Sequence, residues 1–407
     1  MNMPLVILML GVLYFLAHGL SLLFRTTRVP DVLVLIFVGV AGGPMLGILS
    51  PRFFGSFGAV LTTTALAVIL FESGLSLNLR SMTKSLAPTA GLTLVSYFVT
   101  MAVATAGALA MGFSPEEALV TGAIVGGTSS AVVIPMVRAL RINGSTATVL
   151  VLESAITDVL CIVITFGLLD AASSGTLAIG GVLRKIGASF LFATALGMAG
   201  GVLWLKLLRR VREGEATLFT TVASAFLLFG AAELLGLSGG IAVLAFGIAL
   251  ANAPVIAPEA DLPELNSTER MFFGELVFLL KTFFFLYLGL SMRFQDLQVL
   301  LWAAGIVAVI YTARLWVTRL TLSGASRRDA RLAAFLVPKG LAAAVLAGIP
   351  AQRGLPGGGQ LQMLVYSIVL VSIVLTSVLV AAEGSLWMRR LTDVFFRKYP
   401  EETLPSD

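Results

Sequence analysis

The chain has 407 residues, of which 58% are hydrophobic and 12% charged, with a mean hydropathy of +0.99. Soluble domains are about half apolar and about a quarter charged, so this composition excludes a water-soluble globular protein. The formal net charge of +5 does not indicate a nucleic-acid partner, because cytoplasmic loops of membrane proteins collect Lys and Arg for topological reasons.

Thirteen apolar stretches with the length of membrane helices follow one another along the chain. They lie at 3–24, 31–49, 57–75, 87–111, 116–138, 147–169, 181–208, 216–236, 239–253, 271–292, 299–322, 331–351 and 361–383. The first stretch has no basic residue before Arg25, so we expect a spanning helix there and not a signal peptide. A spanning helix needs about 20 residues. We predict an all-α integral membrane protein with a membrane domain at 1–383 and a short cytoplasmic tail at 384–407.

The basic residues are distributed unequally between the two sides of these predicted helices. Of the 27 Lys and Arg residues, 18 fall in the odd-numbered connections and the tail, and five fall in the even-numbered connections. Loops rich in Lys and Arg stay in the cytoplasm. The bias therefore predicts a protein of the plasma (inner) membrane with its N-terminus outside and its C-terminus in the cytoplasm.

Several charged side chains fall inside the predicted spans, where each costs on the order of 2.5–3.5 kcal/mol at the bilayer centre. They are Lys281, Arg314, Lys339, Glu72, Glu153, Asp158, Glu233 and Glu275. Such residues face either a partner or a water-filled path. Their clustering favours a transport path over a set of purely structural ion pairs. Glu72 lies near a helix end, and we expect it to be structural or to line the mouth of the path.

Two of the predicted helices contain sequences that interrupt a helix. The stretch 116–138 contains Gly-Gly-Thr-Ser-Ser at 126–130, which has poor helix propensity. The stretch 331–351 contains Val-Pro-Lys-Gly at 337–340, where proline removes a backbone donor. If the seventh helix is a linker, the remaining helices form two halves of six helices each. The two interrupted helices are then each the fifth helix of their half. Such matched interruptions indicate a secondary transporter with two inverted six-helix repeats, helices 1–6 and 8–13, whose helices 5 and 12 are discontinuous.

The sixth predicted helix places two acids on different faces. At about 100° per residue, Ser154 and Asp158 share one face and Thr157 borders them. These oxygen atoms suit a partly dehydrated alkali cation, and unwound carbonyl groups of the fifth helix could complete its shell. Glu153 lies about 140° away from Asp158. We therefore expect Glu153 to pair with a basic residue of another helix, and Arg314 is the candidate.

These segments, in this order, resemble the monovalent cation:proton antiporter superfamily, specifically its sodium/proton exchanger branch, across essentially all of the predicted helices. The segments that carry the resemblance are 70–75, 122–128, 153–158, 288–290, the helix of Arg314 and the break at 339–340. The resemblance implies a homodimer in which a core domain moves against a dimerisation domain. It also implies that Asp158 binds proton and cation alternately, that Ser154 and Thr128 help to hold the cation, and that Glu153 pairs with Arg314.

The chain departs from the usual pattern of this family at three places. Thr157 stands where the family has Asn or Asp before the binding aspartate, and Ser129 and Ser130 replace an Asp-Pro pair that is common in the exchanger branch. Lys281 is typical of the other major branch, with potassium-efflux relatives, in which a lysine approaches the aspartate. Ser129 therefore joins the expected cation ligands, and Lys281 joins Lys339 among the expected charge-compensating residues.

The sequence thus predicts exchange of Na⁺ or K⁺ for H⁺ by alternating access at Asp158, electroneutral at one ion for one proton. The expected partners are the cation, the proton, membrane lipid and a second copy of the chain, with no cofactor. A cation channel and a sodium-coupled organic-anion symporter of related fold are the alternatives. An enzyme is not expected, because no HExxH, Gly-x-Ser-x-Gly or Cys/His cluster is present. The basic and aromatic tail predicts an amphipathic anchor.

Overall fold

The computed structural model describes residues 30–47, 51–77, 79–172, 179–212, 218–256, 265–292, 297–322 and 324–401, together with 8, 11–12, 14–16 and 18–19. The first predicted span, 3–24, lies largely outside the described residues. The chain divides into two compact units. Unit 1 comprises Met1–Leu10, Pro51–Lys84 and Ile162–Phe284, and unit 2 comprises Gly11–Ser50, Ser85–Cys161 and Phe285–Asp407. Each unit combines segments from both predicted halves of the sequence.

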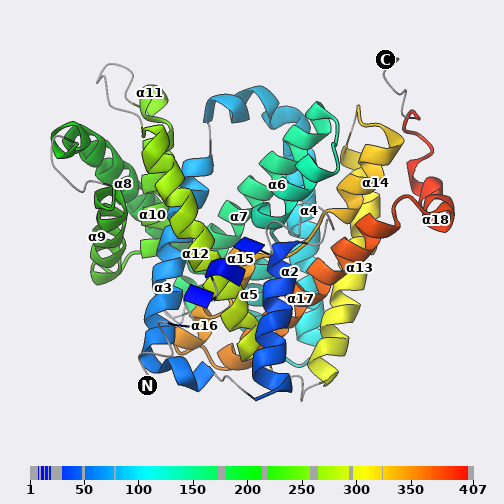
Figure 1. Cartoon of the computed structure of the whole chain (residues 1–407), viewed down its shortest axis with the longest axis horizontal. Coiled ribbons are helices and arrows are strands. Elements are labelled where there is room, and N and C mark those ends of the chain that lie inside the picture. The colour runs from blue at the N-terminus through cyan, green and yellow to red at the C-terminus, as the bar shows by residue number, and fades with distance from the viewer. Residues whose placement is uncertain are drawn as a thin grey trace. The chain divides into compact units, whose positions relative to one another are not determined.

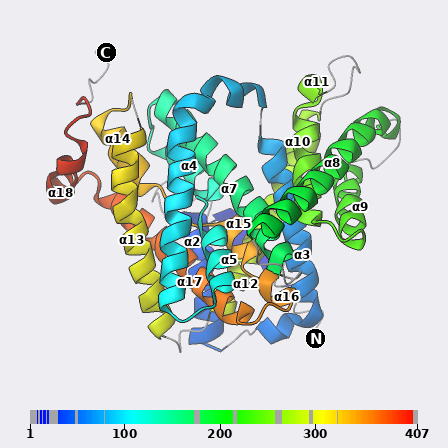
Figure 2. The same ribbon diagram turned by 180° about the vertical axis from the view of Figure 1, so that it is seen from behind.

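Unit 1 is organised around a single buried helix, α10. Its helices are α3 (Pro51–Ser76), α8 (Ile179–Val211), α9 (Thr220–Leu234), α10 (Gly239–Ala251), the short α11 (Ala253–Ile256) and most of α12 (Ser267–Ser291). Helix α10 contacts α3, α8 and α9, and α8 crosses it obliquely (Figure 2). Because its residues are almost all small or apolar, α10 can be buried on every side.

Unit 2 is organised around α17 (Gly358–Ala382), which contacts α2, α5, α13, α14, α15 and α16 (Figure 1). The remaining helices are α2 (Asp31–Val40) with the π-helical turn η1 (Ala41–Met45), α4 (Leu79–Ala110), α5 (Pro115–Val125), α6 (Ser130–Ala139), α7 (Gly144–Ala172), α13 (Leu297–Thr321), α14 (Arg327–Phe335), α15 (Leu341–Leu346), α16 (Ile349–Gln352) and α18 (Leu386–Phe396). The residue ranges of α4, α7 and α12 extend across the boundary between the units.

The observed helices coincide with the predicted stretches from 31–49 onward. Within the part of the chain that the structure describes, seven spans are long and apolar enough to cross a membrane, which indicates an integral membrane protein. They are Thr89–Ala110, Pro115–Ala139, Gly144–Ala171, Phe190–Leu208, Ser267–Ser291, Leu297–Thr321 and Gly358–Ala382. Other predicted stretches form shorter apolar helices, such as Gly239–Ala251. The count of thirteen spans and the inverted repeats stay predictions.

Both predicted interruptions are present. Helix α5 begins with a capping box, in which the Ser114 hydroxyl accepts from the Glu117 backbone N–H and the Glu117 carboxylate accepts from the Ser114 N–H. Helix α5 then ends at Val125, and α6 begins only at Ser130. In the second segment α14 ends at Phe335 and α15 begins at Leu341. Glycine in the first gap and proline with glycine in the second account for these ends.

At two helix crossings a glycine faces a glycine, and the backbones approach too closely for any side chain. In unit 1, a Cβ atom added to Gly74 of α3 would lie 3.0 Å from Gly247 Cα of α10. In unit 2, a Cβ atom added to Gly39 of α2 would lie 3.0 Å from Gly289 Cα of α12. At both crossings the facing atoms belong to the backbone, so a side chain cannot be accommodated by rotation of its neighbour. Small residues let apolar helices pack closely in membranes.

We predict that Gly74→Ala lowers the free energy of unfolding by about 1–3 kcal/mol, because the added methyl group overpacks the crossing. Gly230→Ala in α9 is the matched control, since a Cβ atom there meets nothing within 4 Å. That change should be neutral or stabilising, because alanine favours a helix over glycine by about 1 kcal/mol. Thermal unfolding in detergent measures both. Equal melting temperatures for the two variants would contradict the close crossing.

Candidate functional site

The two interrupted segments meet each other at their breaks. The Ser129 N–H donates to the Pro338 carbonyl group at 2.8 Å. The Lys339 ammonium group donates to the Gly127 carbonyl group at 2.9 Å. A side chain at Gly340 would collide with Ser129, which explains the glycine there. Backbone groups that have left their helices therefore bond across the breaks, as the apolar surroundings require.

Asp158 of α7 lies at the beginning of α6. The Ser130 hydroxyl donates to Asp158 Oδ2 at 2.6 Å, and only 7% of Asp158 is exposed. Ser130 is the first residue of α6, and the capping residue, Ser129, makes no side-chain capping bond. The carboxylate therefore lies at the positive end of the helix dipole, where a negative charge is stabilised.

Side chains of α7 bond the unwound backbone between α5 and α6. The Thr128 N–H donates to Thr157 Oγ1 at 3.1 Å, and the Gly127 N–H donates to Cys161 Sγ at 2.9 Å. Thr157 Oγ1 also donates to the Ser154 carbonyl group at 3.2 Å. Thr157 and Cys161 therefore replace the helical hydrogen bonds that the break removes.

The predicted cation ligands lie together, but their hydroxyl groups differ in what they bond. Ser154 is fully buried, and its hydroxyl donates to the Val151 carbonyl group of its own helix at 2.9 Å. Ser129 Oγ is buried and has no hydrogen-bond partner within the part of the chain that the structure describes. A buried polar atom without a partner is costly. Among the expected cation ligands, Ser129 therefore has a buried hydroxyl group whose hydrogen-bonding capacity is unused in the described chain.

The second buried acid, Glu153, forms the ion pair that its place on α7 suggested. Arg314 Nη2 donates to Glu153 Oε2 at 2.7 Å, and Nη1 donates to Oε1. Glu153 is 1% exposed and Arg314 is 2% exposed. Arg314 also donates to Ser96 Oγ at 2.5 Å and to the Ala333 carbonyl group in the last turn of α14 at 3.2 Å. One guanidinium group thus joins α4, α7, α13 and α14.

Lys281 belongs to unit 1, where its charge acts on Glu72 of α3. Glu72 and Lys281 are therefore electrostatically coupled groups on two helices of the same unit, which the sequence reading of Glu72 did not foresee. The approach of Lys281 to Asp158 stays a prediction.

Sequence reasoning missed three residues that hold this site together: Ser130, Cys161 and Ser96. Ser130 was noted only as a departure from the family pattern. Its position at the start of a helix after a glycine-rich break is a capping signal that could have been read. Cys161 lies one helical turn after Thr157 and so shares its face. Ser96 has no signal in sequence, because its partner lies on a distant helix.

Comparison with known proteins identifies the family of the chain. The family described as "Sodium/hydrogen exchanger, transmembrane" matches residues 11–382. The K(+)/H(+) antiporter NhaP2 of Shewanella sp. (strain MR-4) is 26% identical over 364 residues, covering 85% of this chain and 60% of the relative. The K(+)/H(+) antiporter NhaP of Alkalimonas amylolytica is 26% identical over 415 residues, covering 99% of this chain and 70% of the relative. The chain thus spans only about 60% of the length of the first of these.

Among solved structures, the sodium proton antiporter MjNhaP1 from Methanocaldococcus jannaschii, determined at pH 8, has a TM-score of 0.74 and 20% sequence identity. The match covers 95% of this chain and 100% of that one, so the two share a fold. The match of the family to residues 11–382 covers most of the sequence. The chain therefore belongs to the sodium/hydrogen exchanger family.

Proposed function

We propose that this protein exchanges a monovalent cation, Na⁺ or K⁺, for H⁺ across the plasma membrane by alternating access. Asp158 is the group that the cation and the proton occupy in turn. The names of the relatives support both ions, since two are K(+)/H(+) antiporters and the structural neighbour is a sodium proton antiporter. No cofactor takes part in this scheme.

The observation that carries the proposal is that two buried acids of α7, Glu153 and Asp158, accept hydrogen bonds from different kinds of group. Glu153 is held by two hydrogen bonds from Arg314. Asp158 instead receives a hydrogen bond from the neutral Ser130 hydroxyl, beside the unsatisfied Ser129 Oγ at the same helix start. A carboxylate at the positive end of a helix dipole, beside these hydroxyl oxygens, has the surroundings to hold a cation or a proton in turn.

Exchange follows from the cost of moving a bare carboxylate through an apolar barrier. Asp158 crosses only when it carries a cation or a proton, so each cargo has to leave before the other binds. Ser129 and Ser130 supply hydroxyl oxygens from the start of α6, and Thr128, Ser154 and Thr157 supply further oxygen atoms nearby. Hard oxygen ligands of this kind suit alkali cations. Arg314 balances the charge of Glu153, and Lys339 supplies a positive charge where the two breaks meet.

The wider architecture is part of the same proposal. Under two inverted six-helix repeats, α2 and α10 are both second helices and α3 and α12 are both third helices. The two glycine crossings, α3 with α10 and α2 with α12, are then equivalent pairs. The tripeptide Gly-Leu-Ser stands in both third helices, at 74–76 and 289–291, and it also occurs at 19–21 and 236–238. We further propose a homodimer with the N-terminus outside and the C-terminus in the cytoplasm.

We predict that Asp158→Asn abolishes proton-coupled cation flux, because an amide cannot alternate between a proton and a cation. Flux is measured in proteoliposomes with a pH-sensitive dye inside the vesicles. Asp170→Asn, the same change further along α7, is the control and should retain flux. If Asp158→Asn retained flux while remaining folded, the assignment of Asp158 would be wrong.

We predict that Glu153→Gln is more destabilising than Asp158→Asn. Removing one partner of a buried ion pair costs about 3–5 kcal/mol, since Arg314 would keep an uncompensated charge. Thermal unfolding of the two variants in one detergent gives the ranking. Adding Arg314→Met to Glu153→Gln should recover part of the loss, because it removes that charge. The opposite ranking would identify Glu153 as the transport group.

With one titrating site, we expect one cation to move for each proton and no net charge to cross the membrane. Flux in proteoliposomes should therefore be unchanged when a potassium diffusion potential is imposed during sodium uptake, and a voltage-sensitive dye should report no potential from exchange alone. A potential generated by exchange would contradict the stoichiometry of one to one. Lys281 would then be the residue to test as a second proton carrier.

A further inference from the structure

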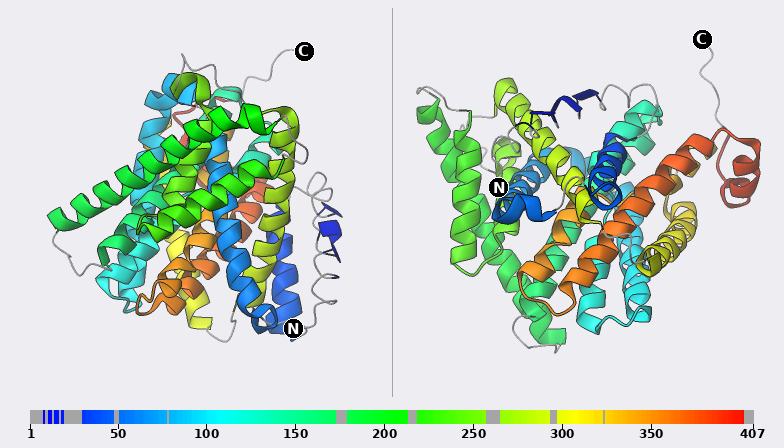
Figure 3. Two further views of the ribbon diagram at one scale, coloured as in Figure 1. Left: turned by 90° about the vertical axis from the view of Figure 1, so that its left-hand side faces the viewer. Right: turned by 60° about the horizontal axis from the view of Figure 1, so that its bottom comes forward.

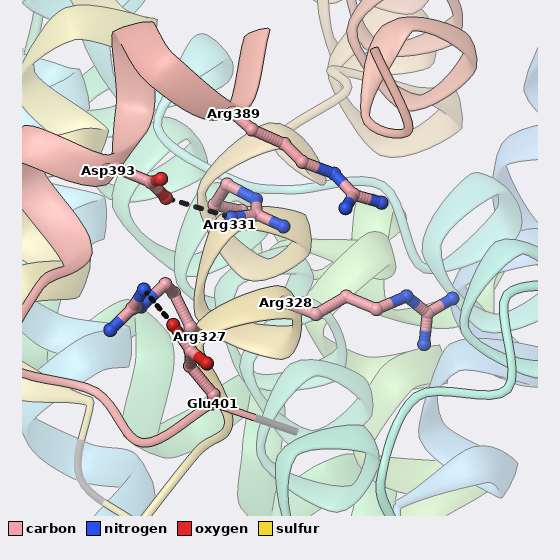
Figure 4. A pocket seen from close by; sticks show the side chains of 6 residues that line it. All are labelled: Arg327, Arg328, Arg331, Arg389, Asp393 and Glu401. Carbon is pink, nitrogen blue, oxygen red and sulfur yellow. Dashed lines mark hydrogen bonds and ion pairs between the residues drawn. The ribbon is translucent and has the colours of Figure 1, made fainter. Parts of the chain in front are cut away.

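A cavity of about 310 Å³ lies between α14 and the C-terminal segment of unit 2 and plays no part in the exchange scheme. Its lining comprises Arg327, Arg328, Arg331, Arg389, Asp393 and Glu401 (Figure 4). Helix α18 follows the end of α17 and packs against α14 (Figure 3). The arginines of α14 and those of α18 therefore face one space.

The acids of this cavity are gathered on one side of it. Arg331 Nη1 donates to Asp393 at 3.1 Å, and Arg327 Nη1 donates to Glu401 at 2.9 Å. Arg331 is 5% exposed, and its second amino group donates to Glu383 at 2.9 Å. The Nε atoms of Arg327 and Arg331 are buried and have no hydrogen-bond partner in the described chain. These two arginines are thus fixed in place with donors left unsatisfied.

The other two arginines extend to the opposite side of the cavity (Figure 4). The backbone carbonyl group of Leu140, at the end of α6, accepts from Arg328 Nη2 at 3.0 Å, which orients this guanidinium group. Arg389 has no ion-pair partner among the residues that the structure describes, and it is exposed. This side of the cavity therefore presents two planar, multidentate donors, of which Arg389 has its charge exposed.

The position of these arginines on α14 runs against the preference of a helix. Arg327 and Arg328 are its first two residues, where the helix dipole is already positive and basic side chains are unfavourable by about 0.3–1 kcal/mol each. Exceptions to local preference are expected at functional sites. A negative ligand would relieve this repulsion. Phosphate oxygens suit the guanidinium fork best, because they accept two parallel hydrogen bonds.

The surroundings of the cavity indicate where the phosphate comes from. Helix α18 has one exposed apolar stripe, formed by Trp387, Leu391 and Val394, which are 61%, 63% and 61% exposed. The same helix carries the exposed Arg389 and Arg390. An amphipathic helix with apolar and basic faces lies at the lipid headgroups and is attracted to anionic lipid. The cavity is therefore next to a helix that has the features of a headgroup-level element.

We propose that the cavity between α14 and α18 binds the phosphate group of an anionic membrane lipid, with Arg328 and Arg389 as its principal ligands. Arg327 and Arg331, which are held in place by their ion pairs, line the opposite side of the cavity. The volume falls at the lower end of small-ligand sites, about 300–1,000 Å³, and so fits a headgroup and not a whole lipid. The acyl chains extend along the apolar stripe of α18.

The test uses the full chain in a neutral detergent and measures equilibrium binding of fluorescent phosphatidylglycerol and of phosphatidylcholine with the same acyl chains. Phosphatidylglycerol should bind the unaltered protein more tightly. Arg389→Gln should weaken that binding about fivefold, the value of one basic residue close to an anionic headgroup. Arg390→Gln, which removes the same charge from the neighbouring position, is the matched control and should weaken binding clearly less, because Arg390 does not line the cavity.

Two further variants keep the result interpretable. Arg389→Lys keeps the charge but loses the planar fork, so an intermediate loss of affinity is expected. Arg328→Gln tests the site from α14, should one of the α18 variants fail to fold in thermal unfolding. Binding is measured without transport, so its outcome is independent of the exchange proposal. Equal losses from Arg389→Gln and Arg390→Gln would show diffuse surface charge and overturn the site.

Inorganic phosphate separates the two sources of the ligand. We expect millimolar inorganic phosphate to displace little phosphatidylglycerol, because a free ion lacks the acyl chains that contact α18. If inorganic phosphate binds as tightly as the lipid, and both depend on Arg389, the cavity takes free phosphate and the lipid assignment is wrong. Equal affinity for phosphatidylglycerol and phosphatidylcholine would also overturn the proposal.

Discussion

The bidentate pair between Glu153 and Arg314 holds the centre of unit 2 together. Neither charge is tolerable alone in an apolar bundle, and each makes the burial of the other possible. Because Arg314 also donates to the Ala333 carbonyl group, the pair bonds the end of α14 just before the second break. The position of Pro338 and Lys339, and through them of Ser129 and Gly127, therefore depends on an ion pair that does not itself face the proposed ion.

Side chains of neighbouring helices bond the backbone groups that have no helical partner at the breaks. Lys339 bonds the Gly127 carbonyl group, Thr157 accepts from Thr128, and Cys161 accepts from Gly127. Side chains from neighbouring helices thus bond the backbone of the unwound segment between α5 and α6. Asp158 and the Ser129 hydroxyl, at the start of α6, are the groups that we propose to hold the ion. A rigid, satisfied frame around a few adaptable oxygens is what selective ion binding requires.

Most of the fold could be predicted because its signals are local. Apolar length marks the helices, Gly126-Gly127 and Pro338 mark the breaks, and the angular separation on α7 assigns Glu153 and Asp158 to different partners. The hydrogen bonds of Ser96 and Ser130 could not be predicted, because their partners come from other helices. The coupling of Lys281 to Glu72 was missed for the same reason. Gly74 and Gly289 lie in segments that carry the family resemblance, but no local signal pairs them with Gly247 and Gly39 across the crossings.

Those glycine crossings restrict which substitutions the sequence can accept during evolution. At most buried positions a larger residue can be rescued by a smaller neighbour. At Gly39, Gly74, Gly247 and Gly289 the obstacle is the facing main chain, which every amino acid shares. No second substitution can make room, so these positions lack compensating partners. They should serve as fixed landmarks for aligning distant members of the family, where a quarter or less of the other residues agree.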